Sequence, residues 1–176
     1  IVPTTSVGNS ASFAILAEKV IVEINLSQSP ALEGLHDIFT PKRRPSREPM
    51  PLTSVSDRIG TTAIEIPPEK IVAIVFTEKH DSASTILPPD AETAAIAGHL
   101  IDFFGAEIAQ GRLTESLMPI QAGIGTIANA VVSGLNEGPF KHLTMYSEVL
   151  QDSTFELFDS GKLDFASGSS ITVSEA

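Results

Sequence analysis

Two short apolar runs predict β-strands in the first half of the chain. Residues 19–25 (KVIVEIN) are rich in β-branched side chains, and residues 71–76 (IVAIVF) are continuously apolar over the length of one strand. A run without polar alternation is typical of a sheet that is covered on both faces, so we expect the second strand to be buried. Between them, residues 39–53 contain four prolines and four basic residues. This composition disfavours a regular helix or a central strand and predicts an extended surface segment.

A long helix is predicted at the start of the second half. Paired prolines at residues 86–90 (ILPPD) mark a boundary, and Asp90 is suited to cap a helix whose apolar positions recur at helical spacing up to Gln110. Gly111 is placed to end that helix. We therefore divide the chain into residues 1–88 and 89–176.

The rest of the chain predicts alternating strands and helices. An apolar stretch at 117–122 precedes a glycine turn at Gly123–Gly125 and helical spacing at 127–135. A strand at 142–146, a short helix at 154–159 and one or two further strands at 165–173 follow. Strands separated by helices indicate an α/β fold with a mainly parallel sheet, so the chain is predicted to hold parts of two α/β domains. In such folds, functional groups gather at the carboxyl ends of the strands.

Composition and charge narrow the classes of partner. Of the 176 residues, 42% are hydrophobic and 19% are charged, as in an ordinary globular protein. No apolar run approaches the roughly 18 residues that a membrane helix needs, and 22 acidic against 11 basic residues give a net charge of −11. We therefore expect neither a membrane nor nucleic acid as a partner. The absence of cysteine favours an intracellular protein, and the start at Ile1, without Met or a signal pattern, indicates a fragment or a processed chain.

Basic residues cluster only in the proline-rich segment. Lys42, Arg43, Arg44 and Arg47 are four of the eleven basic residues, so a phosphate would find its basic patch there. Charge runs are usually solvated surface, and that interpretation is favoured here. The four histidines are far apart and lack the spacing of metal ligands, so no metal site is predicted; they are His36, His80, His99 and His142.

Two places at predicted strand ends carry candidate chemistry. The turn at Gly123–Gly125 opens a helix, where backbone N–H groups can bind a phosphate or a cofactor arm, although glycines also serve plain turns. It lacks the third glycine of a dinucleotide fingerprint and the Gly-Lys-Ser/Thr of a P-loop. Glu148 follows the strand at 142–146, before a loop and a helix that Asp152 could cap. Composition alone favours an exposed structural glutamate at this position.

Five segments together resemble one enzyme family. The runs PIQAGIGTIANAVVSGL and FKHLTMYSEVLQDSTFELFDSGKLDFAS are similar to segments of the acetyl-CoA hydrolase and succinyl-CoA:acetate CoA-transferase family, which are class I CoA-transferases. Support comes from VIVEINLSQSPALEGLHDI, PPEKIVAIV and AIAGHLIDFF, in the order that the family has them. The resemblance runs along essentially this whole chain but covers only the middle of the family's longer chain.

The resemblance implies an active site and a substrate. Glu148 would be the nucleophile that forms a glutamyl-CoA thioester, with acetyl-CoA as the substrate and a carboxylate such as succinate or acetate, or water, as the acceptor. The residues implied to contact coenzyme A are Gly123, Ile124, Gly125, Thr126 and Ile127. At Thr126 the family usually has Asn, a change that affects affinity more than mechanism.

The resemblance also implies the architecture and setting. Residues 1–88 would end an N-terminal CoA-transferase domain, and residues 89–176 would begin a C-terminal one that carries the glycine turn and Glu148. A homodimer and a mitochondrial or cytoplasmic location are expected. Family members draw oxyanion donors from segments outside this region, so the alternative is a non-catalytic CoA-binding or scaffold fragment.

Overall fold

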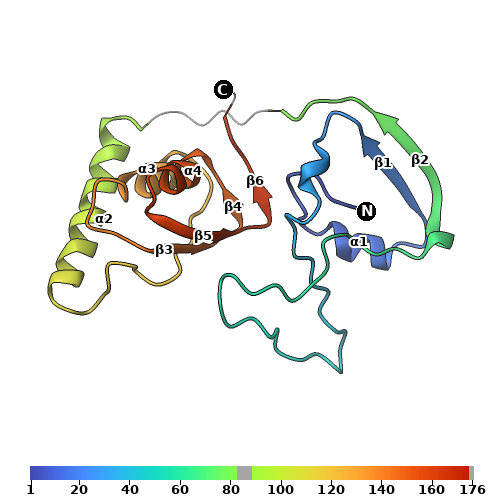
Figure 1. The fold of residues 1–176 in the computed structure, drawn as a ribbon, viewed down its shortest axis with the longest axis horizontal. Helices are drawn as coiled ribbons and strands as arrows, with labels where there is room; N and C mark the ends of the chain where they lie inside the picture. Colours follow the sequence, from blue (N-terminus) through green and yellow to red (C-terminus); the bar gives the residue numbers. More distant parts are fainter. Residues whose placement is uncertain (83–88, 175–176) are drawn as a thin grey trace. The chain divides into compact units, whose positions relative to one another are not determined.

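The chain forms two compact units, Ile1–Ser82 and Ala83–Ala176. A computed structural model describes residues 1–82 and 89–174, and Figure 1 shows the course of the chain. Each unit is described by itself. Within the described residues no helix has the length and apolar character needed to cross a membrane.

The first unit is built on two parallel strands. Helix α1 (Ser10–Leu16) leads into β1 (Val20–Asn25), which pairs with β2 (Ile71–Thr77) from Val20 opposite Ile71 to Asn25 opposite Thr77. Both strands fall where the β-branched runs predict them. Short 3₁₀ turns at Pro30–Leu32 and Pro68–Lys70 flank the long connection between the strands.

The prediction that β2 is buried is wrong. Most of its apolar side chains are exposed, up to 64% for Phe76, because little in the described residues covers the faces of the two-stranded sheet that it forms with β1. The small core of the unit instead contains Val22, Ile38 and Ile64. An antiparallel bridge joins Ile38 to Thr61 within the connection.

The proline-rich segment is extended and exposed, as predicted. Residues 39–53 contain no helix or strand and lie mostly on the surface. Lys42 forms an ion pair with Glu48 at 2.9 Å, and both side chains are more than half exposed. Such a pair contributes little to stability, which fits a solvated loop.

The second unit begins with the long helix that the sequence predicts. Helix α2 spans Ala91–Ala109, and the Asp90 carboxylate accepts a hydrogen bond of 2.8 Å from the Thr93 N–H, as expected of an N-cap. Gly111 follows the helix with φ of +71°. The predicted boundary at residues 86–90 falls partly on 86–88, which lie outside the described residues.

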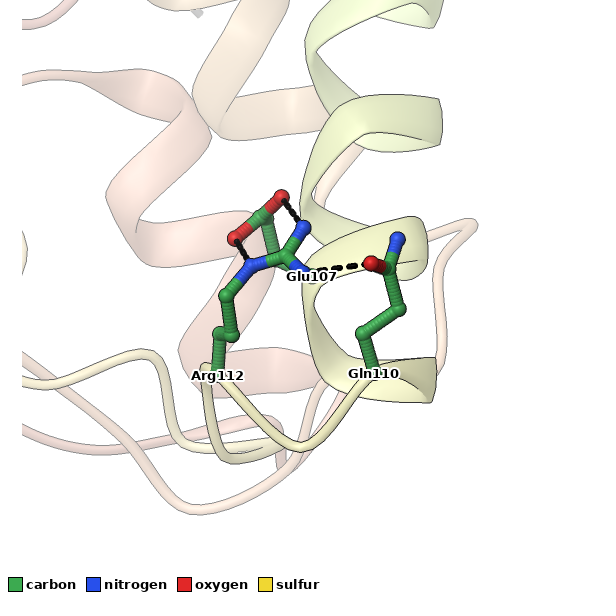
Figure 2. A network of polar contacts seen from close by, with 3 residues as sticks. All are labelled: Glu107, Gln110 and Arg112. Atoms are coloured by element: carbon green, nitrogen blue, oxygen red, sulfur yellow. Dashed lines mark hydrogen bonds and ion pairs between the residues drawn. The ribbon is translucent and has the colours of Figure 1, made fainter.

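A charged network closes the carboxyl end of α2 (Figure 2). The Arg112 guanidinium binds both carboxylate oxygens of Glu107 and the side-chain oxygen of Gln110. The Arg112 hydrogen bond lowers the pKa of Glu107 below its ordinary value, and the same bond raises the pKa of Arg112. The network holds the chain where it turns away from the helix.

Among residues 89–174 the second unit contains three helices and four short strands. After α2 come α3 (Thr126–Gly134), β3 (Leu143–Tyr146), β4 (Val149–Leu150), α4 (Asp152–Asp159), β5 (Leu163–Ser167) and β6 (Ser170–Ile171). Strand β3 pairs with β5 and β4 pairs with β6, both in parallel. Helix α2 packs on α3, and α3 packs on α4 (Figure 1). Parallel pairs joined by helices confirm the predicted α/β fold class.

The core of this unit lies between the helices and β3–β5. Phe140, Leu143, Met145 and Leu157 are almost completely buried, and the Phe140 ring meets Phe104 of α2 edge-on at 6.4 Å between centroids. Edge-to-face pairs of this kind add to the stabilisation from burial. The core therefore fixes β3, and with it the start of the segment that carries Glu148.

Two predictions for this unit need correction. Residues 117–122 form no strand, because Leu117 and Met118 have positive φ values of 61° and 80° and only Ile120 pairs, in a bridge to Met145. Asp152 does not cap α4: it is the first helical residue, and Gln151 precedes it as the cap. The Asp152 carboxylate instead accepts a hydrogen bond of 3.1 Å from the Ser174 N–H.

Candidate active site

Glu148 lies in the two-residue connection between β3 and β4. Its side chain is exposed, whereas its backbone carbonyl is firmly held. That oxygen accepts hydrogen bonds from the Ser169 N–H at 2.9 Å, the Ser170 N–H at 3.1 Å and the Ser169 hydroxyl at 2.9 Å. The arrangement presents an exposed carboxylate on a fixed backbone, at the carboxyl end of a parallel strand.

The glycine turn forms the amino end of α3. Gly125 is the N-cap, with φ of 114° and ψ of 174°, a conformation that is essentially restricted to glycine. Within the described residues, the N–H groups of Ile124, Thr126 and Ile127 donate to no protein acceptor, as expected for the start of a helix. Ile124 and Ile127 are also exposed, at 74% and 51%. Free donors beside exposed apolar side chains fit a ligand with an anionic part and an apolar part.

Residues on either side of Glu148 bind this turn. The Ser147 hydroxyl donates to the Ala122 carbonyl at 2.8 Å and accepts from the Ala122 N–H at 3.2 Å. The Gln151 side chain donates to the Gly123 carbonyl at 3.0 Å and accepts from the Gly125 N–H at 3.3 Å. The candidate nucleophile and the candidate binding turn are therefore parts of one hydrogen-bonded site within the second unit.

Sequence reasoning assigned no role to Ser147 or Gln151. Both are buried, at 7% and 3% exposure, although their residue types are usually found on surfaces. The sequence signal that could have indicated them is their position: Ser147 immediately precedes Glu148, and Gln151 follows it by three residues. A buried polar side chain needs a partner, and here the partner is the backbone of the turn.

Two cavities lie elsewhere in the structure. One of about 350 Å³ lies between α2 and α3, and one of about 410 Å³ lies in the first unit beside α1. Neither is lined by Glu148 or by residues 123–127. The candidate site is made of a strand end and a helix start, and it lies outside both of these cavities.

Two of the four histidines, His36 and His142, have polar contacts in this fold. His36 is buried and its Nε2 lies 2.7 Å from the Thr4 carbonyl, while His142 Nδ1 lies 3.1 Å from the Asp164 carboxylate. Among residues 1–82 and 89–174 no cluster of three or more histidine or acidic side chains is arranged to hold a metal ion.

Known proteins support the resemblance inferred from the residues. Residues 1–76 match the family described as the acetyl-CoA hydrolase/transferase N-terminal domain. The chain is 47% identical over 175 residues to an acetyl-CoA hydrolase of Saccharomyces cerevisiae, an alignment that covers 99% of this chain and 33% of that protein. It is 46% identical over 174 residues to a succinyl-CoA:acetate CoA-transferase of Clostridium kluyveri, covering 99% and 32% of the two chains. The chain thus spans about a third of the length of these relatives.

Solved structures share the fold. A 4-hydroxybutyrate CoA-transferase from Porphyromonas gingivalis matches with a TM-score of 0.57 at 16% identity, over 97% of this chain and 35% of that one. RipA from Yersinia pestis matches with a TM-score of 0.54 at 17% identity, over 97% of this chain and 36% of that one. At this identity the likeness shows the fold alone, and it confirms a CoA-transferase-like α/β architecture.

Proposed function

We propose that this chain, 99% of which aligns with an acetyl-CoA hydrolase and with a succinyl-CoA:acetate CoA-transferase, carries the nucleophile and part of the CoA site of an acyl-CoA-processing enzyme. Glu148 is the nucleophile, and residues 123–127 contact coenzyme A. One observation carries the proposal: Gln151, three residues after Glu148, hydrogen-bonds to the turn that opens α3, and Ser147, immediately before Glu148, hydrogen-bonds to Ala122, which precedes that turn. A reactive carboxylate and a ligand-binding helix start therefore share one site.

The proposed reaction is covalent catalysis by a carboxylate. A Glu148 oxygen attacks the carbonyl carbon of acetyl-CoA, the C–S bond breaks, and an acetyl-glutamyl anhydride and CoA thiolate form. The thiolate then attacks the glutamyl carbonyl carbon of the anhydride, which releases acetate and leaves a glutamyl-CoA thioester. A carboxylate such as succinate takes the CoA by the reverse steps, or water hydrolyses the thioester to glutamate and free CoA.

The turn is proposed to stabilise negative charge on CoA. The N–H groups of Ile124, Thr126 and Ile127, which donate to no acceptor in the described part of the chain, lie at the positive end of the α3 dipole, which favours an anion. Thr126 stands where the family usually has Asn. Because the backbone N–H is present with either side chain, we expect this difference to change CoA affinity modestly.

A paired substitution tests the role of Glu148. In the full-length protein, Glu148→Gln keeps the size of the side chain but removes the nucleophile, and we expect acetyl-CoA turnover to fall by at least about 10³-fold, leaving only what binding and orientation supply. Glu115→Gln is the control, since Glu115 pairs with Lys141 on the surface. Equal activity of the two variants would refute the proposal.

Hydrolase and transferase activity are separated by the acceptor. Acetyl-CoA loss that is independent of succinate indicates that water attacks the thioester, whereas loss that requires succinate indicates transfer. The result depends on how well the closed site excludes water. The assay therefore assigns the reaction without changing the proposed role of Glu148.

A second candidate function applies to these residues in isolation. Because the chain spans about a third of the relatives' length, it would bind CoA without turnover if donors to the developing oxyanion come from other segments. Calorimetric titration of this chain with CoA beside an activity assay decides this, since binding without turnover is the expected signature.

The wider setting is also proposed. We expect residues 1–88 to complete an N-terminal CoA-transferase domain and residues 89–176 to begin a C-terminal one. The protein is expected to act as a homodimer on acyl-CoA and short carboxylates, in the mitochondrion or cytoplasm. Sedimentation of the full-length protein tests the dimer, and imaging of a tagged form tests the compartment.

A further inference from the structure

We propose that Gln151 is a positioning residue of this site, whose side-chain amide holds the glycine turn in the conformation that binds CoA. The inference rests on the proposed function of the turn and extends it to a residue that touches neither the substrate nor the reacting carboxylate. It concerns the segment from Gly123 to Gly125 and the residue three positions after Glu148.

The geometry is that of a clamp across the turn. Nε2 of Gln151 donates to the Gly123 carbonyl at 3.0 Å, and Oε1 accepts from the Gly125 N–H at 3.3 Å. One planar side-chain amide thus hydrogen-bonds to the backbone at both ends of a three-residue turn. Gln151 is 3% exposed, which limits the access of water to its amide, whereas Gly123 and Gly125 lie at the surface.

The backbone of Gln151 is itself held in place by hydrogen bonds to Thr154. The Gln151 carbonyl accepts from the Thr154 N–H at 2.9 Å, and the Gln151 N–H donates to the Thr154 hydroxyl at 3.4 Å. Thr154 is 2% exposed and also contacts the Met145 sulfur in the core. Because this backbone is tied to α4 and β3, the amide has little freedom to follow the turn if the turn moves.

The conformational freedom of Gly125 is the reason that the turn needs to be held. Its backbone conformation is open to glycine alone, and glycine also has more alternative conformations than any other residue. A turn with Gly123 and Gly125 therefore has many conformations to sample when nothing holds it. CoA would bind only the fraction of molecules in which the N–H groups converge, so apparent affinity falls with that fraction.

Glu148 is held by different contacts. Its carbonyl is fixed by Ser169 and Ser170, and none of these bonds involves the Gln151 side chain. Removing the amide should therefore free the turn while the backbone of the nucleophile stays in place. The expected kinetic result is a loss of CoA affinity with the covalent step retained at saturating substrate, whereas general unfolding would reduce both.

The first test uses Gln151→Met in the full-length protein, which keeps length and apolar bulk but removes both hydrogen bonds. We expect the Kd for CoA, measured by calorimetry, to rise about tenfold, in line with the loss of two neutral hydrogen bonds. Amide exchange at Gly125 should accelerate in the ligand-free protein. Gln110→Met is the matched control, because Gln110 is exposed at the end of α2 and both quantities should stay unchanged.

The second test uses Gln151→Glu and pH. At pH 8 the carboxylate would face the Gly123 carbonyl oxygen and repel it, whereas a protonated carboxyl can donate to that oxygen as the amide does. A carboxyl buried beside a carbonyl titrates above the ordinary glutamate pKa of about 4.3. We expect the ratio of variant to wild-type Kd to fall from about tenfold or more at pH 8 towards one near pH 5.

The outcomes separate the two levels of the proposal. If the wild-type protein does not bind CoA, the proposed function of the turn is refuted and the role of Gln151 falls with it. If the wild type binds and Gln151→Met binds equally well, only the positioning role is refuted. Unchanged Gly125 exchange in Gln151→Met, or a Gln151→Glu ratio that does not change with pH, would likewise overturn the clamp.

Discussion

Lys162 gives the sharpest prediction about stability in the second unit. Its ammonium group donates to the carbonyls of Leu135, Asn136 and Gly138, at 3.2, 2.6 and 2.7 Å. These carbonyls follow directly after α3, which ends at Gly134. One cation thus binds the carboxyl end of the helix whose amino end forms the candidate CoA turn.

The expected cost of Lys162→Met follows from these contacts. A hydrogen bond to a charged group contributes about 1.5–3 kcal/mol, and a cation at a helix carboxyl end contributes about 0.3–1 kcal/mol. Lys162 is partly exposed, so water replaces some of the lost bonds and the three contributions do not add. We expect a loss of about 2–3 kcal/mol.

Hydrogen exchange of the α3 amides measures this loss locally, which avoids assuming that the full-length protein unfolds in one step. A loss of 2–3 kcal/mol corresponds to exchange that is about 30- to 150-fold faster. Lys141→Met is the control, because Lys141 pairs with Glu115 on the surface and such pairs contribute about 0–1 kcal/mol. If the two variants exchange alike, the reasoning about Lys162 is wrong.

Three further predictions concern other contacts. Gly125→Ala should destabilise the second unit by about 1–3 kcal/mol, measured by hydrogen exchange of the α3 amides, because alanine is strained in the backbone conformation of Gly125. Gly123→Ala is the control and should change that exchange little, because its methyl group would meet nothing within 4 Å. Arg112→Met should return the pKa of Glu107 to its ordinary value in an NMR titration. In the wild type the stabilisation from this pair is present above the ordinary glutamate pKa, and it is lost as the pH falls through the lowered pKa of Glu107. Gly60→Ala should lower the thermal midpoint of the first unit strongly in a calorimetric scan, because its methyl group would lie 2.2 Å from a backbone carbonyl oxygen.

Local signals predicted the elements that depend on local chemistry. Helix α2 has its expected ends because Asp90 caps the first turn and Gly111 adopts the positive φ that a helix end requires. Strands β1 and β2 follow from β-branched runs, and the turn before α3 follows from two glycines. The position of Glu148 at a strand end was also visible, since the core strand that precedes it is apolar.

Other features depend on contacts that the sequence does not display. The apolar stretch at 117–122 fails as a strand because of backbone angles at Leu117 and Met118, which no residue type there requires. The capping position of Gln151 and its bonds to the turn depend on how α3 and α4 pack. The exposure of β2 reflects what packs on the faces of its sheet, which depends on tertiary contacts and not on the local pattern.

The central claim is that Glu148 is the residue acylated during turnover. The most direct measurement is to incubate the full-length protein with acetyl-CoA, reduce it with borohydride or treat it with hydroxylamine, and map the modified peptide by mass spectrometry. The account predicts a modification on Glu148 that requires acetyl-CoA and disappears once water or an added carboxylate such as succinate has discharged the thioester before trapping. Active protein in which Glu148 stays unmodified would contradict it.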